Sequence, residues 1–219
     1  MQCGYAIDMP TTSTPTKPLH PRGVVLPATV HRYGAPAPFG VPWLDEPGSQ
    51  PALVRFSRGG GLPTLLPDVL GIALRIDPDG DPADLLFATT GRGPVGRFVL
   101  RPRRADTVAA ATYSTLQPYR TPTGPVVLAA TPAAGAEATV ITLAVARPTG
   151  PWLGFGEVTV ESTAHPTDAD ISFDPFLNPV PGLANYGWTR RLREGAYAAA
   201  RRARRRGDRH ARVTDLHHG

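Results

Sequence analysis

Proline and glycine interrupt this chain so often that long helices have little room. There are 23 glycines and 26 prolines among 219 residues, and both residue types disfavour the interior of helices and strands. The short apolar or alternating runs between these breaks predict β-strands at 52–56, 71–76, 84–88, 97–101, 125–130, 139–146 and 157–161. Many short strands separated by turn residues favour an antiparallel sandwich or barrel.

Two segments predict helices: a short one at 106–116 and an Arg/Ala-rich tract after Trp188. In that tract Arg193, Tyr197 and Arg201 stand four residues apart, so they share one helix face. A guanidinium beside a phenol favours the phenolate, which is a known proximal ligand of haem iron. A tyrosine among solvated arginines is more commonly a packing residue, so the spacing alone leaves both interpretations open.

Charge and composition limit the classes of partner that this protein is expected to have. Residues 190–212 contain ten of the 23 basic and two of the 18 acidic residues, so this segment carries +8 and the rest −3. We favour a solvated Arg helix there over a membrane surface or nucleic acid site. No nucleic acid partner is expected, because the barrel segments lack interleaved basic and aromatic residues.

The apolar runs and the cysteine content predict a cytoplasmic protein without a membrane span. No apolar run is long enough to cross a bilayer, and residues 1–17 lack the apolar centre of a signal peptide. Cys3 is the only cysteine, which excludes an intrachain disulfide and favours a reducing compartment. None of the histidines stands near a second residue at a spacing typical of zinc sites.

Four segments, taken in order along the chain, resemble the haem catalase superfamily. They are Lys17–Gly23 around His20, the strand Val54-Arg55-Phe56-Ser57, the run from Pro67 to Leu86, and Phe173-Asp174-Pro175 followed by Asn178, Pro181-Gly182-Leu183 and Arg193-x-x-x-Tyr197. The short chain is most similar to the minimal catalase-related organic peroxidases. The resemblance implies an α+β, mainly β fold: a catalase-like antiparallel eight-stranded β-barrel with a C-terminal Arg/Ala-rich helix.

The resemblance also implies a role for each matching residue around heme b. His20 would be the distal acid/base, with its imidazole held by Ser57. Tyr197 would be the proximal iron ligand, its phenolate sustained by Arg193. The haem propionates would pair with basic residues, namely Lys17, Arg55 and Arg201.

One departure from the family pattern concerns the distal asparagine. The stretch Asp84-Leu85-Leu86-Phe87-Ala88-Thr89-Thr90 places Ala88 or Thr89 where the family has that amide. Loss of the amide donor predicts weak catalase turnover, since a second peroxide is harder to order. The chain also lacks the length for the family's arms and added helical domain, so the haem should be open to larger peroxides and reducing co-substrates.

The sequence therefore predicts a haem peroxidase that reduces organic or hydrogen peroxides through a ferryl state. The partners would be a peroxide and a small-molecule reductant, and an open barrel is compatible with a homodimer. We expect a flexible arm at 1–17, a barrel domain with its haem-ligand helix at 18–206, and a flexible basic tail at 207–219. The alternatives are a hydroperoxide isomerase of the allene oxide synthase branch, or a small-molecule or lipid-binding barrel that has lost haem.

Overall fold

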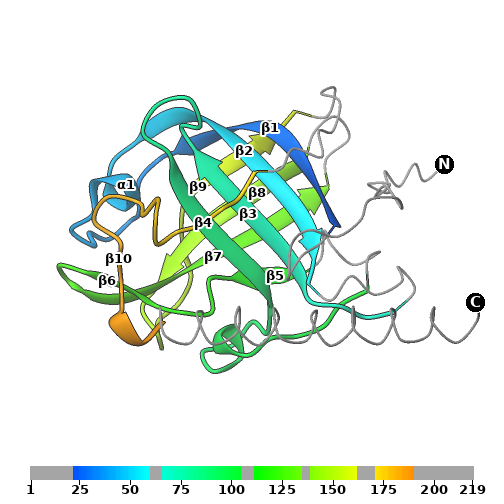
Figure 1. Ribbon diagram of the computed structural model, residues 1–219. Coiled ribbons are helices and arrows are strands. Elements are labelled where there is room, and N and C mark those ends of the chain that lie inside the picture. Colours follow the sequence, from blue (N-terminus) through cyan, green and yellow to red (C-terminus); the bar gives the residue numbers. More distant parts are fainter. Residues whose placement is uncertain (1–21, 60–65, 105–110, 135–138, 162–170, 190–219) are drawn as a thin grey trace, which may run out of the picture.

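The structure, a computed structural model, describes residues 22–59, 66–104, 111–134, 139–161 and 171–189 (Figure 1). The described residues form ten strands, one short α-helix, one 3-10 turn and a last helical stretch at 187–189. In chain order the numbered elements are β1 Arg22–Arg32, α1 Pro42–Asp45, β2 Gly48–Arg58, β3 Leu70–Ile76, β4 Ala83–Thr90, η1 Gly96–Phe98, β5 Thr112–Ser114, β6 Tyr119–Thr121, β7 Gly124–Ala134, β8 Thr139–Ala146, β9 Leu153–Val160 and β10 Ala184–Asn185.

Eight of these strands close into an antiparallel barrel. The ring runs β1–β2–β3–β4–β5–β7–β8–β9, and β9 pairs back onto β1. The short strands β6 and β10 extend the sheet from β7, outside the ring. Closure pairs the strand edges that an open sheet would leave exposed. The structure thus confirms the predicted mainly β class and eight-stranded barrel, whereas the predicted Arg/Ala-rich helix lies outside the described residues.

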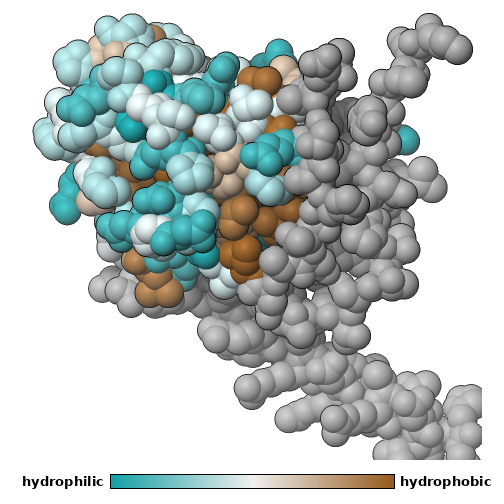
Figure 2. All heavy atoms as spheres, turned by 90° about the horizontal axis from the view of Figure 1, so that it is seen from above, coloured by the Kyte–Doolittle hydropathy of each residue, from teal (hydrophilic) through white to brown (hydrophobic). Residues whose placement is uncertain are grey.

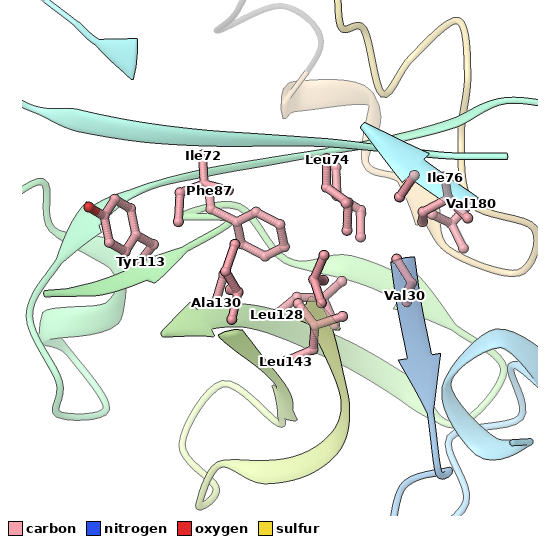
Figure 3. Packing of buried hydrophobic residues seen from close by; sticks show 14 of the residues in the cluster. Val30, Ile72, Leu74, Ile76, Phe87, Tyr113, Leu128, Ala130, Leu143 and Val180 are labelled. Carbon is pink, nitrogen blue, oxygen red and sulfur yellow. The ribbon is translucent and has the colours of Figure 1, made fainter. Parts of the chain in front are cut away.

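Apolar side chains fill the interior of the barrel (Figure 3). Alternate residues of a strand point to opposite faces, so one face of each strand lines the interior. The inward residues come from every part of the ring. Six of them, each at most 4% exposed, are Val30, Leu74, Leu85, Phe87, Leu128 and Leu143. Tyr113 of β5 is also enclosed, and its burial raises the pKa of the phenol, which therefore stays neutral.

Two loops close one end of this barrel. Trp43 of α1 packs edge-on against Phe155 of β9, with ring centroids 5.3 Å apart. Figure 3 shows Val180 beside Ile76 at the same end. Gly182 has a φ of 85°, and an added Cβ would lie 3.0 Å from the Val41 side chain, so the close approach of these two loops requires glycine.

A third loop packs on the outside of the barrel through Arg97. Its guanidinium donates to the carbonyl oxygens of Arg147 at 3.0 Å and Gly150 at 2.9 Å, and lies 4.2 Å from the Trp152 ring centroid. The predicted strand at 97–101 is therefore wrong. The turn at Gly96–Phe98 and these contacts keep the segment off the ladder, and Leu100 makes only an isolated bridge to Thr90.

The prediction of a helix at 106–116 is wrong for its second half. Residues 112–114 form β5, which pairs with both β4 and β7, while 105–110 lie outside the described residues. The predicted strands also do not include β1, which contains Pro27. In the fold Pro27 lies opposite Leu53 of β2, and its carbonyl oxygen accepts a hydrogen bond of 3.0 Å from the N–H of Glu161, one residue beyond the β1–β9 ladder that begins at Ala28.

The described surface is mostly hydrophilic when seen from above, with apolar residues in several areas, the largest near the middle of the view (Figure 2). No helix among the described residues has both the length and the apolar character needed to cross a bilayer.

Candidate functional site

The outer face of β1–β4 carries the predicted distal residues that the structure describes. The ladder registers align them in two rows across the four strands. One row is Val25, Arg55, Ala73 and Leu86; the next is Gly23, Ser57, Gly71 and Ala88. The first three residues of the first row are 1%, 8% and 7% exposed, yet they lie outside the apolar cluster of the interior. These three residues are therefore shielded from solvent, although they lie on the outer face of the barrel.

Arg55 places a buried positive charge on this face. A Cβ added to Gly23 would lie 2.8 Å from Nε and 2.9 Å from Cζ of Arg55, so the guanidinium extends from β2 over the backbone of β1. Glycine at position 23 leaves the space that this side chain occupies. A guanidinium held in this way suits a carboxylate, because its planar fork binds both oxygens.

Ser57 lies in the middle of the second row, between Gly23 and Gly71. Its hydroxyl donates a long hydrogen bond of 3.4 Å to the carbonyl oxygen of Gly71. A serine oxygen also has lone pairs that can accept an N–H. The side chain is only 6% exposed, so its orientation is set by the sheet around it.

The structure distinguishes between the two residues predicted for the position of the missing asparagine. Ala88 faces outward in the row of Ser57, whereas Phe87 points into the core. Thr89 uses its Oγ1 to accept a hydrogen bond of 3.2 Å from the backbone N–H of Leu70. Ala88 thus occupies the outward position, and it has no group that could donate a hydrogen bond.

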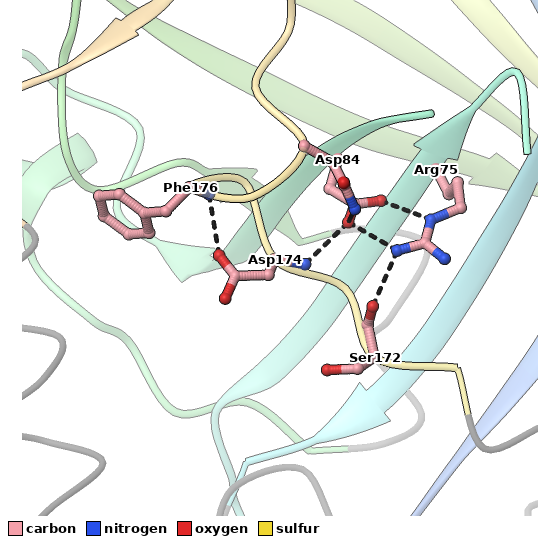
Figure 4. A network of polar contacts seen from close by, with 6 residues as sticks. Arg75, Asp84, Ser172, Asp174 and Phe176 are labelled. Atoms are coloured by element: carbon pink, nitrogen blue, oxygen red, sulfur yellow. Dashed lines mark hydrogen bonds and ion pairs between the residues drawn. The ribbon is translucent and has the colours of Figure 1, made fainter. Parts of the chain in front are cut away.

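A buried ion pair bounds the other end of this outer face (Figure 4). Asp84 of β4 is fully buried and accepts two hydrogen bonds from Arg75 of β3, at 2.8 Å from Nε and 2.7 Å from Nη2. The hydrogen bond to Asp84 raises the pKa of the Arg75 guanidinium, which stays charged. Arg75 also donates to the carbonyl of Ser172 at 2.8 Å and lies 5.2 Å from the Phe173 ring centroid.

The Phe173-Asp174-Pro175 motif is attached to the barrel through the same carboxylate. The backbone N–H of Asp174 and the side-chain amide of Asn178 each donate to Asp84 at 2.8 Å, and the Asp84 N–H donates to the Asn178 carbonyl at 2.8 Å. Asp174 then accepts a hydrogen bond from the N–H of Phe176. The sequence singled out this motif by resemblance, but gave no reason to expect that Asp84 and Arg75 hold it.

Several predicted site residues lie outside the described residues, so their placement stays a prediction. These are Lys17, His20, Arg193, Tyr197 and Arg201. Of the predicted site, the structure brings together Arg55, Ser57 and Ala88 on one face. Within the described part of the chain, no three His, Cys, Asp or Glu side chains are grouped in a way that could hold a metal ion.

Comparison with solved structures gives the same architecture. Catalase A from Saccharomyces cerevisiae matches with a TM-score of 0.56 and 9% sequence identity, over 82% of this chain and 58% of that chain. A fungal catalase matches with a TM-score of 0.54 and 10% identity, over 79% of this chain and 56% of that chain. The fold is catalase-like. This chain spans somewhat more than half the length of either structure.

No family model and no curated protein matches the sequence. At 9–10% identity the structural match shows the catalase-like barrel alone. The activity therefore depends on the residues that this barrel carries, because one fold supports many functions.

Proposed function

We propose that this protein is a haem-dependent peroxidase that reduces organic or hydrogen peroxides and has weak catalase activity. The observation that carries the proposal is the outer face of β1–β4, where buried Arg55 stands beside a row of small residues on a catalase-like barrel. A guanidinium on this face suits the carboxylates of haem, because its planar fork can bind both oxygens of a propionate.

The described residues fit one side of a haem in shape and in charge. The row Gly23, Ser57, Gly71 and Ala88 has no long side chain, which leaves a level floor for a planar group. Arg55 reaches over Gly23 at the edge of this floor and would pair with a propionate. Lys17 and Arg201 are proposed for the same charge pairing.

The remaining roles belong to residues outside the described part of the chain. Tyr197 is the proposed iron ligand, with Arg193 one helical turn away to favour the phenolate. His20 would take a proton from the bound peroxide and return it to the leaving oxygen. Ser57 would accept an N–H of that imidazole and fix its tautomer. Bound haem would supply the redox chemistry that cleaves the peroxide bond.

Ala88 is the reason to expect peroxidase activity with little catalase activity. Its methyl group faces the proposed site where an amide donor would help to order a second peroxide. Reduction of an organic peroxide by a separate reductant has no such requirement. A hydroperoxide isomerase of the same fold remains the alternative enzyme. A binding barrel is less well supported, since the interior is filled by its own side chains.

Titration of the full-length protein with hemin tests this proposal. We expect a high-spin ferric tyrosinate spectrum that is lost in Tyr197→Phe, because phenylalanine has no oxygen to bind iron. Arg55→Leu should weaken hemin uptake, whereas Arg120→Leu, which removes an exposed guanidinium on β6, should not. Absence of a Soret shift in the wild-type protein would refute the haem proposal.

The same preparation gives the activity. We expect guaiacol-type peroxidation to disappear in His20→Ala, and oxygen release from hydrogen peroxide to be low in the wild type. Vigorous oxygen release would show that Ala88 does not limit the catalase reaction. Conversion of a fatty acid hydroperoxide without any reductant would favour the isomerase.

A further inference from the structure

Thr90, the last residue of β4, has a buried hydroxyl without a hydrogen-bond partner in the part of the chain that the structure describes. The residue is 0% exposed, and none of the described residues pairs with its Oγ1. Buried polar groups are nearly always paired, because a hydroxyl removed from water without a partner is costly. An unpaired hydroxyl at the end of the outer face of β1–β4 is therefore unusual.

Strand alternation places Thr90 on the same outer face as Ala88. Asp84, Leu86, Ala88 and Thr90 follow one another at every second position of β4, whereas Leu85 and Phe87 point into the core. Thr90 stands two residues beyond Ala88, which is about 7 Å along a strand. It lies towards the end of the sheet at which β1 begins, since the row of Ala88 already includes Gly23.

Two neighbouring hydroxyl groups, Thr89 of β4 and Ser114 of β5, have hydrogen-bond partners within the protein. Thr89 accepts the N–H of Leu70 at 3.2 Å, and Ser114 donates to the carbonyl of Arg97 at 2.5 Å while accepting the N–H of Leu116 at 3.1 Å. These two hydroxyls hold the backbone together. The hydroxyl of Thr90 bonds no backbone group in this way, which suggests that its partner is a ligand.

We propose that Thr90 is a substrate-binding residue whose hydroxyl donates a hydrogen bond to an oxygen of the bound peroxide, in place of the amide missing at Ala88. This inference rests on the proposed function. A hydroxyl can donate and accept, so it can follow a peroxide through protonated and deprotonated states. Ala88 and Thr90 are close enough along β4 for one small ligand to lie beside both.

The test compares Thr90→Val with Thr89→Val in the full-length protein. Valine has nearly the shape of threonine and lacks the hydroxyl. Without hemin, Thr90→Val should melt at or above the wild-type temperature, because no protein hydrogen bond is lost. Thr89→Val should melt lower, because the N–H of Leu70 loses its partner. Hemin uptake, followed by the Soret band, should be unchanged in Thr90→Val.

Azide, a small anion that accepts hydrogen bonds, then serves as the ligand probe on the hemin-loaded proteins. We expect Thr90→Val to weaken azide binding about five- to tenfold, the loss of one hydrogen bond. Thr90→Ser should restore most of the affinity. Unchanged azide affinity in Thr90→Val, or a melting temperature as low as that of Thr89→Val, would overturn this inference alone. Failure of the wild type to take up hemin would overturn it together with the proposed function.

Discussion

At the scale of single residues, Gly23 and Arg55 depend on each other. An added Cβ at position 23 would lie 2.7 Å from the Phe56 carbonyl oxygen as well as 2.8 Å from Nε of Arg55. The sequence shows only a glycine three residues after His20 and an arginine in a β-strand. Their contact exists because β1 and β2 pair in the register that sets Gly23 opposite Ser57.

Gly23→Ala should therefore displace the Arg55 guanidinium. We expect a loss of about 1–3 kcal/mol in the free energy of unfolding, typical of overpacking, and weaker hemin uptake. Urea unfolding and hemin titration measure the two effects. Gly93→Ala is the matched control, since nothing lies within 4 Å of the added Cβ. Equal behaviour of the two variants would show that Gly23 does not shape the site.

At the scale of elements, the segment 171–189 is held to the sheet by polar contacts at the Asp84 carboxylate and by the pairing of β10 with β6. Asp84 receives hydrogen bonds from Arg75, Asp174 and Asn178, which belong to β3 and to the segment itself. The segment then continues to Leu183, which is buried in the core cluster.

Asn178→Ala should loosen the segment without opening the barrel. The side-chain hydrogen bond to a buried carboxylate would be lost, and we expect a cost of about 1.5–3 kcal/mol. Amide hydrogen exchange should become faster at Asp84 and Asp174 and stay slow at Leu74. Ser172→Ala is the control, because Ser172 contributes its backbone carbonyl to Arg75. Faster exchange throughout the barrel would contradict a local role.

At the scale of the whole molecule, closure of the ring gives the barrel one continuous interior. Leu128 and Leu143 from β7 and β8 meet Leu74 and Phe87 from β3 and β4 across it (Figure 3). The strands that carry the proposed site therefore have their inner faces fixed by the opposite wall. A substitution in the interior should therefore also affect the residues on the outer face of the same strands.

Phe87→Ala tests this dependence, since Phe87 is buried next to outward-facing Ala88. We expect a loss of about 3–5 kcal/mol, from lost burial and the cavity that remains. Leu177→Ala should cost almost nothing, because Leu177 is 79% exposed. Thermal and urea unfolding of both variants measure the difference. A small loss in Phe87→Ala would mean that the interior can collapse around the missing ring.

Much of the barrel could be predicted because it depends on local patterns. Alternating runs predicted parts of β2, β3, β4, β7, β8 and β9 at nearly their observed positions. The failures share one cause. The segments 22–32, 97–101 and 112–114 take a structure imposed by their neighbours: β1 by pairing with β2, the Arg97 loop by contacts with Gly150 and Trp152, and β5 by pairing on both sides.

The sequence by itself determined the mainly β class and the antiparallel arrangement, and it predicted one site from Arg55, Ser57 and either Ala88 or Thr89. Only the tertiary structure decided that Arg55, Ser57 and Ala88 lie on one outer face, that Ala88 and not Thr89 points outward, and that Asp84 holds a segment almost a hundred residues away. The physical reason is that alternation is a property of one strand, whereas register, closure and buried hydrogen bonds join strands that are distant in sequence.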